Sequence, residues 1–501
     1  MILGDPDKTA GGATLDELFR RAGVRSPDAL ALVDPLNRES FGDGVPRKLT
    51  YGEADRLISA FAARLRGFGL RTDAIVALQL PNTVESVIAL LGVLRAGMIA
   101  APLPLLWRQQ EIVAALCGVG AKAIVTSGAA SARSATLAAV ELFPIRHICA
   151  FGRGLPDGVA PLDDLFTDGA ADIVHAAPRP GPAAVHVALI TFDVTAAGVT
   201  PVARNHLQLM AGGLGVFLEA GISQQVNILS AIPPASFAGV ALTVLPWLLA
   251  GGTLALHHGG DPDVLAAQCD GLAEATLMLP GPALAPLAEA GRLGAGVKTI
   301  AALWRAPERL AASAAWHGEA ALVDVASFGE IGLLAGRRDG DGRPVPLPHG
   351  PVSAPRGSPG AAIVAETART RAGTLALRGP MVPAQRFPPG TEPSGVPNAA
   401  GFLDTGFTCR LEGEGDGLTV TGPPGGIGAV GGYRFSQPSV DVEVASVDPA
   451  ATLMAAPHGI LGQRLAGSAP DRPAARAALL ARGGNPLIAG AFRARNAANS
   501  A

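Results

Sequence analysis

The sequence predicts an α/β fold in which parallel strands alternate with helices. The first observation is that short β-branched runs alternate with segments of helical periodicity along the chain. The second is composition: apolar residues make up 49% and charged residues 16% of the 501 residues, which favours large cores and excludes a disordered chain. The third is length, because domains usually hold roughly 100 to 200 residues, so this chain should form more than one structural unit.

The individual elements are predicted from apolar spacing and from capping residues. Apolar residues that recur three and four positions apart indicate helices, and Gly after such a run indicates the end of the helix. Short apolar runs bounded by turn residues indicate buried strands. In chain order, the expected elements are a helix over residues 13–22 ended by Gly23, a helix through 57–65, a strand at 75–80, a helix over 84–96 capped by Pro81-Asn82-Thr83 and ended by Gly97, and strands at 98–102 and 123–126.

Charge and hydropathy exclude some classes of partner. Lysine and arginine total 39 against 42 acidic residues, so the chain lacks the basic surface that nucleic-acid binding needs. The apolar stretch 237–258 approaches the ~20 residues that span a bilayer. Pro246 and Gly251-Gly252 interrupt it, so we expect a helix, a turn and a strand at 253–256, and no transmembrane segment. Residues 1–12 lack the apolar core of a secretory signal, which favours a cytoplasmic location.

Glycine and proline mark the expected domain boundary. The chain holds 64 Gly and 42 Pro, and they cluster at 338–360 and 387–401. Such clusters favour loops or a linker, and we expect the chain to divide near Gly406. The predicted units are an N-terminal domain of residues 1–406 and a C-terminal domain of residues 407–501.

Several motifs occur in the order typical of one enzyme superfamily. They are Leu49-Thr50-Tyr51-Gly52-Glu53, Pro81-Asn82-Thr83-Val84-Glu85, Gly92-Val93-Leu94-Arg95-Ala96-Gly97, Pro102-Leu103-Pro104, 373–380, 401–406 and 431–436. With these motifs the chain resembles, over roughly residues 12 to 465, the adenylate-forming enzymes, or AMP-dependent synthetases and ligases. The resemblance implies an acyl-CoA synthetase-like fold, with a large N-terminal region of packed α/β subdomains and a small, here shortened, C-terminal α+β domain. It also implies activation of a carboxylate by ATP to an acyl adenylate, usually followed by transfer to a thiol.

The resemblance places the phosphate loop of the superfamily at residues 191–202. Such a loop offers free backbone N–H groups, is rich in Gly, Ser and Thr, and carries a Lys. Here Val202 stands where the Lys is expected, and Asp193 adds a carboxylate that would repel phosphate. Arg204 could substitute for the Lys or could be a solvated residue at the start of a helix. The remaining candidate nucleotide-binding residues are Thr191, Thr195, Gly198 and Thr200.

Two further nucleotide motifs are only partly matched. Phe328-Gly329 matches the part of an aromatic-Gly-x-Thr-Glu run whose ring lies near adenine, so both are candidate nucleotide-binding residues. Glu330 precedes the position of the magnesium-binding Glu by two residues, and it is either a metal ligand or a loop carboxylate in water. Phe407 replaces the Asp that binds the ribose, and a phenyl ring cannot accept those hydrogen bonds. Asp404 is either a nucleotide-binding substitute or a turn residue.

The C-terminal region lacks the catalytic Lys of the superfamily. Its ammonium group stabilises the charge that develops during adenylation. The hinge 421–424 also lacks the usual Arg, and two prolines should stiffen it. No catalytic residue is assigned, and Arg204 and Glu330 are the candidate substitutes. The four lysines of the sequence are Lys8, Lys48, Lys122 and Lys298.

The acyl pocket is expected beside two segments. Residues 301–307 replace a run of small residues that lies against the substrate in the superfamily, and Ser236 and Phe237 stand near the position of an aromatic residue or His. We expect Trp304 and Arg305 to fill the pocket. The alternative is a reshaped pocket in which Arg305 pairs with a carboxylate ligand.

These departures lead to two hypotheses about function. The first is a homologue that has lost, or strongly reduced, ATP-dependent carboxylate adenylation and is kept as a ligand-binding or scaffold protein, because each missing group is typically worth ~3 to 4 kcal/mol in barrier height. The second is a divergent but active acid-CoA or acid-carrier-protein ligase that requires ATP and magnesium. The expected partner is a carboxylic acid or acyl ligand, with CoA or an acyl carrier protein as further candidates. The sequence leaves open whether the protein forms a homodimer.

Overall fold

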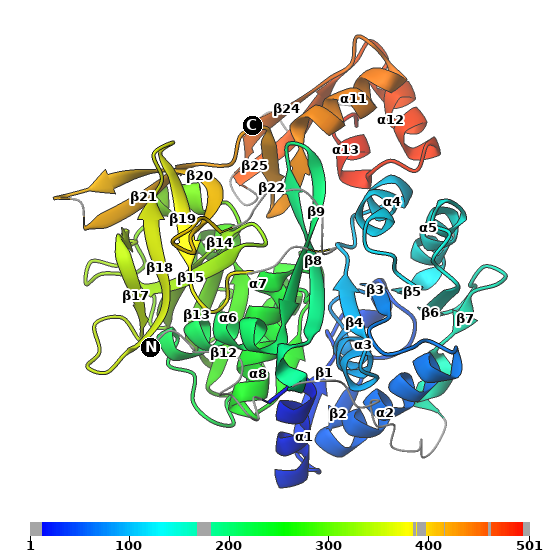
Figure 1. Ribbon diagram of the computed structural model, residues 1–501, viewed down its shortest axis with the longest axis horizontal. Helices are drawn as coiled ribbons and strands as arrows, with labels where there is room; N and C mark the ends of the chain where they lie inside the picture. The colour runs from blue at the N-terminus through cyan, green and yellow to red at the C-terminus, as the bar shows by residue number, and fades with distance from the viewer. Residues whose placement is uncertain are drawn as a thin grey trace.

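The computed structural model describes residues 13–167, 182–383, 387, 397–414, 416–458 and 462–493. Over these residues the chain forms two large mixed sheets, a six-stranded antiparallel sheet and a small C-terminal unit (Figure 1). The predicted α/β class is therefore confirmed. The expectation for residues 1–12 and most of the predicted loop at 387–401 lie outside the described residues.

A seven-stranded sheet has the order β7-β6-β5-β3-β4-β8-β9, and its strands are parallel except for β9, which runs antiparallel to β8. Successive residues of β3 point to opposite faces, so Val76 packs toward α3 while Ile75 and Ala77 pack toward α4 and α5. The bounds are β3 Ile75–Gln79, β4 Ile99–Pro102, β5 Ala123–Ser127, β6 His147–Phe151, β7 Ala160–Pro161, β8 Val187–Thr195, β9 Gly198–Asn205, α2 Tyr51–Gly67, α3 Val84–Arg95, α4 Gln109–Cys117 and α5 Gly128–Glu141.

An eight-stranded sheet has the order β15-β14-β13-β12-β10-β11-β1-β2. Its strands are parallel except for β2 and β15 at the two edges. The bounds are β1 Leu30–Val33, β2 Lys48–Thr50, β10 Ile228–Ser230, β11 Leu254–Leu256, β12 Ala275–Pro280, β13 Val297–Trp304, β14 Ala321–Phe328, β15 Gly332–Arg337, α1 Leu15–Arg25, α6 His206–Glu219, α9 Pro262–Asp270 and α10 Leu284–Glu289.

A six-stranded antiparallel sheet follows, and the C-terminal unit comes after it. The sheet order is β16-β21-β20-β19-β18-β17, and the C-terminal unit contains the hairpins β22–β23 and β24–β25. In Figure 1 this unit, drawn in orange and red, lies above α4 and the tip of the β8–β9 hairpin. The bounds are β16 Leu347–Pro348, β17 Gly350–Ala354, β18 Ala362–Arg369, β19 Thr374–Arg378, β20 Leu403–Glu412, β21 Gly417–Gly422, β22 Ile427–Val430, β23 Tyr433–Ser436, α11 Gln437–Val447, β24 Thr452–His458, β25 Gly462–Ser468, α12 Arg472–Ala481 and α13 Pro486–Gly490.

The predicted N-terminal elements are present, with two local corrections. Gly23 does not end its helix, because α1 continues to Arg25. Thr83 precedes α3 but its side chain makes no capping hydrogen bond. The N–H of Val84 donates instead to Oδ1 of Asp34 at 2.9 Å, so a carboxylate from a distant segment caps this helix.

The apolar stretch 237–258 is a folded core segment. It forms α7 (Phe237–Gly239), a π-helical turn over Val240–Val244, α8 (Leu245–Ala250) and then β11. Gly251 ends α8 with φ 70°, a left-handed conformation that favours glycine. Among the described residues, no helix is long and apolar enough to cross a membrane.

The expected boundary near Gly406 falls inside strand β20. Phe407 belongs to the core of the large body, whereas Val430 belongs to a separate core within the C-terminal unit. We therefore propose that the two units divide at residues 423–426, after the last strand of the six-stranded sheet.

Candidate functional site

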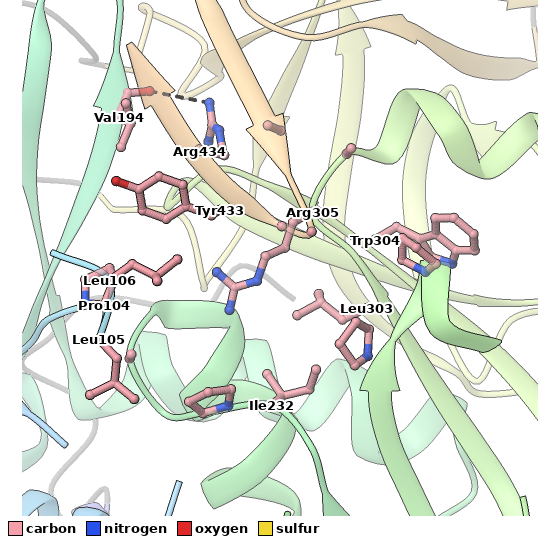
Figure 2. Close-up of a pocket in the computed structure, with 18 of the residues that line it drawn as sticks. Pro104, Leu105, Leu106, Val194, Ile232, Leu303, Trp304, Arg305, Tyr433 and Arg434 are labelled. Carbon is pink, nitrogen blue, oxygen red and sulfur yellow. Dashed lines mark hydrogen bonds between the residues drawn. The ribbon is translucent and has the colours of Figure 1, made fainter. Parts of the chain in front are cut away.

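A cavity of about 300 Å³ lies where both large sheets meet the C-terminal unit (Figure 2). Four parallel strands end at it, because its wall includes residues that follow or close β4, β10, β12 and β13. The wall is completed by residues 192–194 of β8 and by residues 431–434 at the tip of the β22–β23 hairpin. Ligands of α/β proteins bind outside the carboxyl ends of parallel strands, so this cavity is the candidate site.

Trp304 lines the cavity without closing it. Its side chain is 7% exposed, and its indole Nε1 donates to Oδ1 of Asp324 at 2.7 Å. Arg338 holds the same carboxylate through a 2.7 Å ion pair. The ring lies directly against Gly281, where an added Cβ would come within 2.5 Å of it. The indole is therefore fixed in the wall, and a cavity remains beside it.

Arg305 points from the end of β13 into the cavity, between Tyr433 and Leu106 on one side and Ile232 on the other (Figure 2). Its Nη2 donates to the hydroxyl of Ser236 at 2.8 Å. That hydroxyl also accepts the N–H of Gly239 at 3.0 Å, so it is fixed as the N-cap of α7. Burial lowers the pKa of the Arg305 guanidinium. Among the described residues, no carboxylate forms an ion pair with it.

The predicted phosphate loop is a β-hairpin. Strands β8 and β9 pair without interruption from Leu189↔Arg204 to Thr195↔Gly198, so only Ala196 and Ala197 form the turn. The hydroxyl of Thr195 donates to the carbonyl of Gly198 at 3.0 Å and closes this turn. Thr191 is buried in β8, and Thr200 lies opposite Asp193 in the ladder. The four candidate residues therefore share one hairpin and surround no loop.

Asp193 is ion-paired to the C-terminal unit. Nη1 of Arg434 donates to Oδ1 of Asp193 at 2.9 Å, and the two side chains are 12% and 14% exposed. Nη2 of Arg434 also donates to the carbonyl of Val194 at 3.4 Å (Figure 2). Gly329 completes the junction, because a Cβ there would lie 2.5 Å from Arg434 and 2.7 Å from Asp193. Arg434 was part of a recognised motif, but its partner could not be predicted.

The two aromatic residues of the nucleotide motifs face each other. Phe328 and Phe407 are both buried, with ring centroids 5.6 Å apart and ring planes at 85°. Such an edge-to-face pair is a packing contact of a protein core. Arg434 lies over the Phe407 ring, 5.6 Å from its centroid. Neither ring offers an open face to a base.

Arg204 and Glu330 are also enclosed by protein groups. The guanidinium of Arg204 lies 3.8 Å from the centroid of the Phe237 ring, and it donates to the carbonyls of Glu330, Ile331 (2.8 Å) and Met381 (3.2 Å). Burial lowers the pKa of Arg204 to about 10. The carboxylate of Glu330 accepts the N–H of Phe237 at 2.8 Å, and burial raises its pKa. Glu330 is 8% exposed, which differs from a loop carboxylate in water.

Asp404 has the geometry of a turn residue. One carboxylate oxygen accepts the N–H of Gly406 at 2.9 Å, and the other accepts the hydroxyl of Thr374 at 3.0 Å. Among the described residues, no three His, Cys, Asp or Glu side chains are grouped so that they could hold a metal ion. Glu330 thus has no neighbouring set of ligands in that part of the chain.

A second contact that the sequence did not indicate joins α4 to the C-terminal unit. Oε1 of Glu111 accepts from Nδ2 of Asn485 at 2.7 Å and from the Tyr433 hydroxyl at 3.3 Å. The same amide of Asn485 contacts the Tyr433 hydroxyl at 2.7 Å. Burial and the charge of Glu111 raise the pKa of Glu443, on α11, to about 7. Hydrogen bonds among Glu111, Tyr433 and Asn485 thus join α4 to the C-terminal unit.

This arrangement defines an α/β protein with a ligand cavity at the carboxyl ends of its parallel strands. A family model described as AMP-binding enzyme matches residues 19–298, and the chain belongs to that family. The recognised resemblance to adenylate-forming enzymes is confirmed.

Two curated relatives that match part of the chain are ligases by name. A 2-hydroxy-7-methoxy-5-methyl-1-naphthoate–CoA ligase of Streptomyces carzinostaticus is 26% identical over 268 residues, which cover 51% of this chain and 46% of the relative. A salicyl-AMP ligase / salicyl-S-ArCP synthetase of Mycobacterium tuberculosis is 40% identical over 88 residues, covering 18% of this chain and 15% of the relative. The chain thus spans less than half the length of either curated relative.

Solved structures share the fold over nearly the whole chain. The amide bond synthetase McbA from Marinactinospora thermotolerans has a TM-score of 0.69 at 19% identity and covers 94% of both chains. The apo structure of MbtA from Mycobacterium smegmatis has a TM-score of 0.61 at 22% identity, covering 95% of this chain and 90% of that one. These likenesses confirm the acyl-CoA synthetase-like fold.

Proposed function

We propose that this family member has lost, or strongly reduced, ATP-dependent adenylation of carboxylates and is kept as a ligand-binding or scaffold protein. The observation that carries the proposal is the β8–β9 hairpin at the position of the phosphate loop. Successive N–H groups of a strand point to opposite edges, so they do not converge on one phosphate as the N–H groups of a nest do. The turn residues Ala196 and Ala197 add no side-chain donor.

The position expected for the nucleoside supports the same proposal. Phe328 and Phe407 pack against each other, so the ring expected near adenine is buried and the ribose-binding carboxylate is replaced by a second ring. Arg204 and Glu330 would have to leave buried hydrogen bonds before they could meet phosphate or magnesium. Breaking such buried charged contacts typically costs 1.5 to 3 kcal/mol or more, in order of magnitude. The residues present therefore fit magnesium-ATP poorly.

The alternative is a divergent acid-CoA or acid-carrier-protein ligase. The names of the two curated relatives favour it, because both are ligases of aromatic acids. The open cavity leaves room for an acid in this protein as well. No lysine follows Lys298, so such a ligase would need a cation other than an ammonium group at the adenylation step.

Release of pyrophosphate from ATP separates the two functions. The purified full chain is assayed with short, medium, long and aromatic acids, beside an active adenylate-forming enzyme as a positive control. We expect no carboxylate-dependent pyrophosphate above the rate without acid. Release at ordinary ligase rates would contradict the proposal and establish the alternative. Asp404→Asn serves as a matched variant, because a ligase that uses Asp404 would lose activity with it.

A further inference from the structure

We infer that the cavity binds a compact apolar monocarboxylate, without nucleotide, and that Arg305 is the group that holds its carboxylate. The inference deepens the proposed function and rests on it, since it names the ligand that a family member without adenylation would keep. It is argued from the charge of Arg305, the chemistry of the opposing wall and the volume of the cavity.

The charge of Arg305 is the first step. A guanidinium has five N–H donors, and among the described residues Arg305 makes one side-chain hydrogen bond, to Ser236 at 2.8 Å. Within the part of the chain that the structure describes, no carboxylate lies within ion-pair distance of it, and the charge of Glu330 acts on it from beyond that distance. Arg434, another cation of the same wall, is paired with Asp193. Arg305 is partly buried, and a cation that is partly removed from water is stabilised when an anion pairs with it. Arg305 therefore leaves room for an anionic partner on its cavity side.

The geometry of Arg305 is the second step. Its side chain extends into the cavity from the end of β13 (Figure 2). Two contacts restrict it: the hydroxyl of Ser236 at its tip, and Gly432 beside its stem, where an added Cβ would lie 2.9 Å from Cδ. A planar guanidinium held in this way can bind a carboxylate with two parallel hydrogen bonds. The C-terminal hairpin thus helps to position the anchor.

The chemistry of the remaining wall selects the body of the ligand. The cavity residues around the guanidinium are largely apolar: Leu105, Leu106, Ile232, Leu303 and the prolines Pro104, Pro233, Pro280 and Pro282. The carboxylate that Asp193 contributes to the same wall is paired with Arg434, so these two side chains add no net charge beside the apolar lining. An uncharged apolar body with one carboxylate matches this lining.

The volume sets the size of the ligand. About 300 Å³ is at the lower end of the range for small-molecule sites, roughly 300 to 1,000 Å³. The cavity therefore suits an aromatic or short aliphatic acid and is too small for a long acyl chain. Trp304, fixed by Asp324 and packed on Gly281, limits the cavity on one side.

Calorimetric titration of the full chain without ATP tests this inference. The probes are benzoate, trans-cinnamate and octanoate, each compared with its neutral amide, and palmitate as the long acid. We expect at least one of the three short acids to bind, at least tenfold more tightly than its amide. Absence of binding by all three, or equal binding of acid and amide, would overturn the inference.

Variants identify the anchor. Arg305→Gln should weaken acid binding at least tenfold and leave amide binding unchanged, whereas Arg305→Lys should retain part of the preference for the acid. A merely structural role would weaken both probes alike. Arg292→Gln, which removes a half-exposed arginine paired with Asp263, is the control for net charge. Arg309 is a further arginine that lines the cavity. If Arg309→Gln abolishes the acid preference and Arg305→Gln does not, the anchor is Arg309 and the inference is overturned.

The two proposals fail in different ways. Failure of this inference leaves pyrophosphate release absent and carboxylate binding absent or independent of Arg305. Failure of the proposed function appears as pyrophosphate release, whatever the titration without ATP shows. Unfolding midpoints of each variant confirm that a lost signal reflects binding.

Discussion

Arg434 of the C-terminal hairpin and Asp193 of the β8–β9 hairpin form a 2.9 Å ion pair between two segments 241 residues apart in the sequence. Asp193 belongs to residues 191–202, which the resemblance places at the phosphate loop of the superfamily. It neutralises a carboxylate that would repel phosphate, and it fixes the C-terminal unit over the cavity. One contact therefore joins the C-terminal unit to the β8–β9 hairpin beside the cavity.

Breaking this pair should loosen the C-terminal unit. Because both side chains are little exposed, a double-mutant cycle of Asp193→Asn and Arg434→Gln should give a coupling of about 1 to 3 kcal/mol in urea unfolding. Cleavage by a protease at residues 423–426 should become faster in each single variant. Arg410→Gln, in a pair whose Arg side chain is 66% exposed, is the control and should change stability by no more than about 0.5 kcal/mol. A coupling near zero would contradict the role of the pair.

Trp304→Gly should destabilise the protein by about 3 to 5 kcal/mol, because it removes a large buried ring and leaves Asp324 with one partner fewer. Trp304→Phe should cost less, since it keeps most of the packing against Gly281 and loses mainly the hydrogen bond. The urea midpoints of the two variants measure both values. Equal losses would mean that the hydrogen bond matters more than the packing.

Phe407→Asp restores the residue type that the superfamily uses for ribose, yet it should not restore nucleotide binding. A carboxylate placed against Phe328 would be buried, and the neighbouring cation, Arg434, is already paired with Asp193, so the variant should lose stability. Phe407→Leu should cost less than about 1.5 kcal/mol, because it preserves an apolar volume. Thermal unfolding compares the two variants. An Asp variant as stable as the Leu variant would show that the ring is not part of the core.

The contact of the C-terminal unit with α4 should weaken as pH rises. Burial, with the charge of Glu111 as a second cause, raises the pKa of Glu443 from 4.5 to about 7. A raised folded-state pKa contributes stability that is complete below the unfolded value and is lost as pH rises through the folded value. The urea midpoint should therefore fall as the pH rises from about 4.5 to about 7. Glu443→Gln should remove this fall of the midpoint. An unchanged pH profile in that variant would refute the attribution of the fall to Glu443.

The sequence predicted the elements whose signals are local. Helix α3 and strands β3 to β5 follow from apolar spacing and from Gly97, whose φ of 71° ends the helix, so their bounds differ from the prediction by one residue or so. Gly23 was misleading because a single Gly is tolerated near the end of a helix, and α1 ends at Arg25 instead. The ordered motifs identified the superfamily because strands and caps serve packing and are independent of catalysis.

The site depended on contacts between distant segments, which the sequence could not supply. Arg204 was a candidate phosphate ligand, and only the fold places Phe237 beneath it and backbone carbonyls around it. Trp304 was a candidate pocket residue because of its size, and only the fold shows its hydrogen bond to Asp324. The pairing of Asp193 with Arg434 has no local signal, since each residue alone is compatible with a solvated position.

Titration of magnesium-ATP into the full chain, followed by calorimetry, tests the central claim most directly. The hairpin at the phosphate position, the Phe328–Phe407 contact and the Asp193–Arg434 pair together predict no saturable binding at millimolar ATP, with or without trans-cinnamate. An adenylate-forming enzyme titrated in parallel should bind. Saturable binding of ATP by this chain, strengthened by the acid, would contradict the account and favour the alternative of an active ligase.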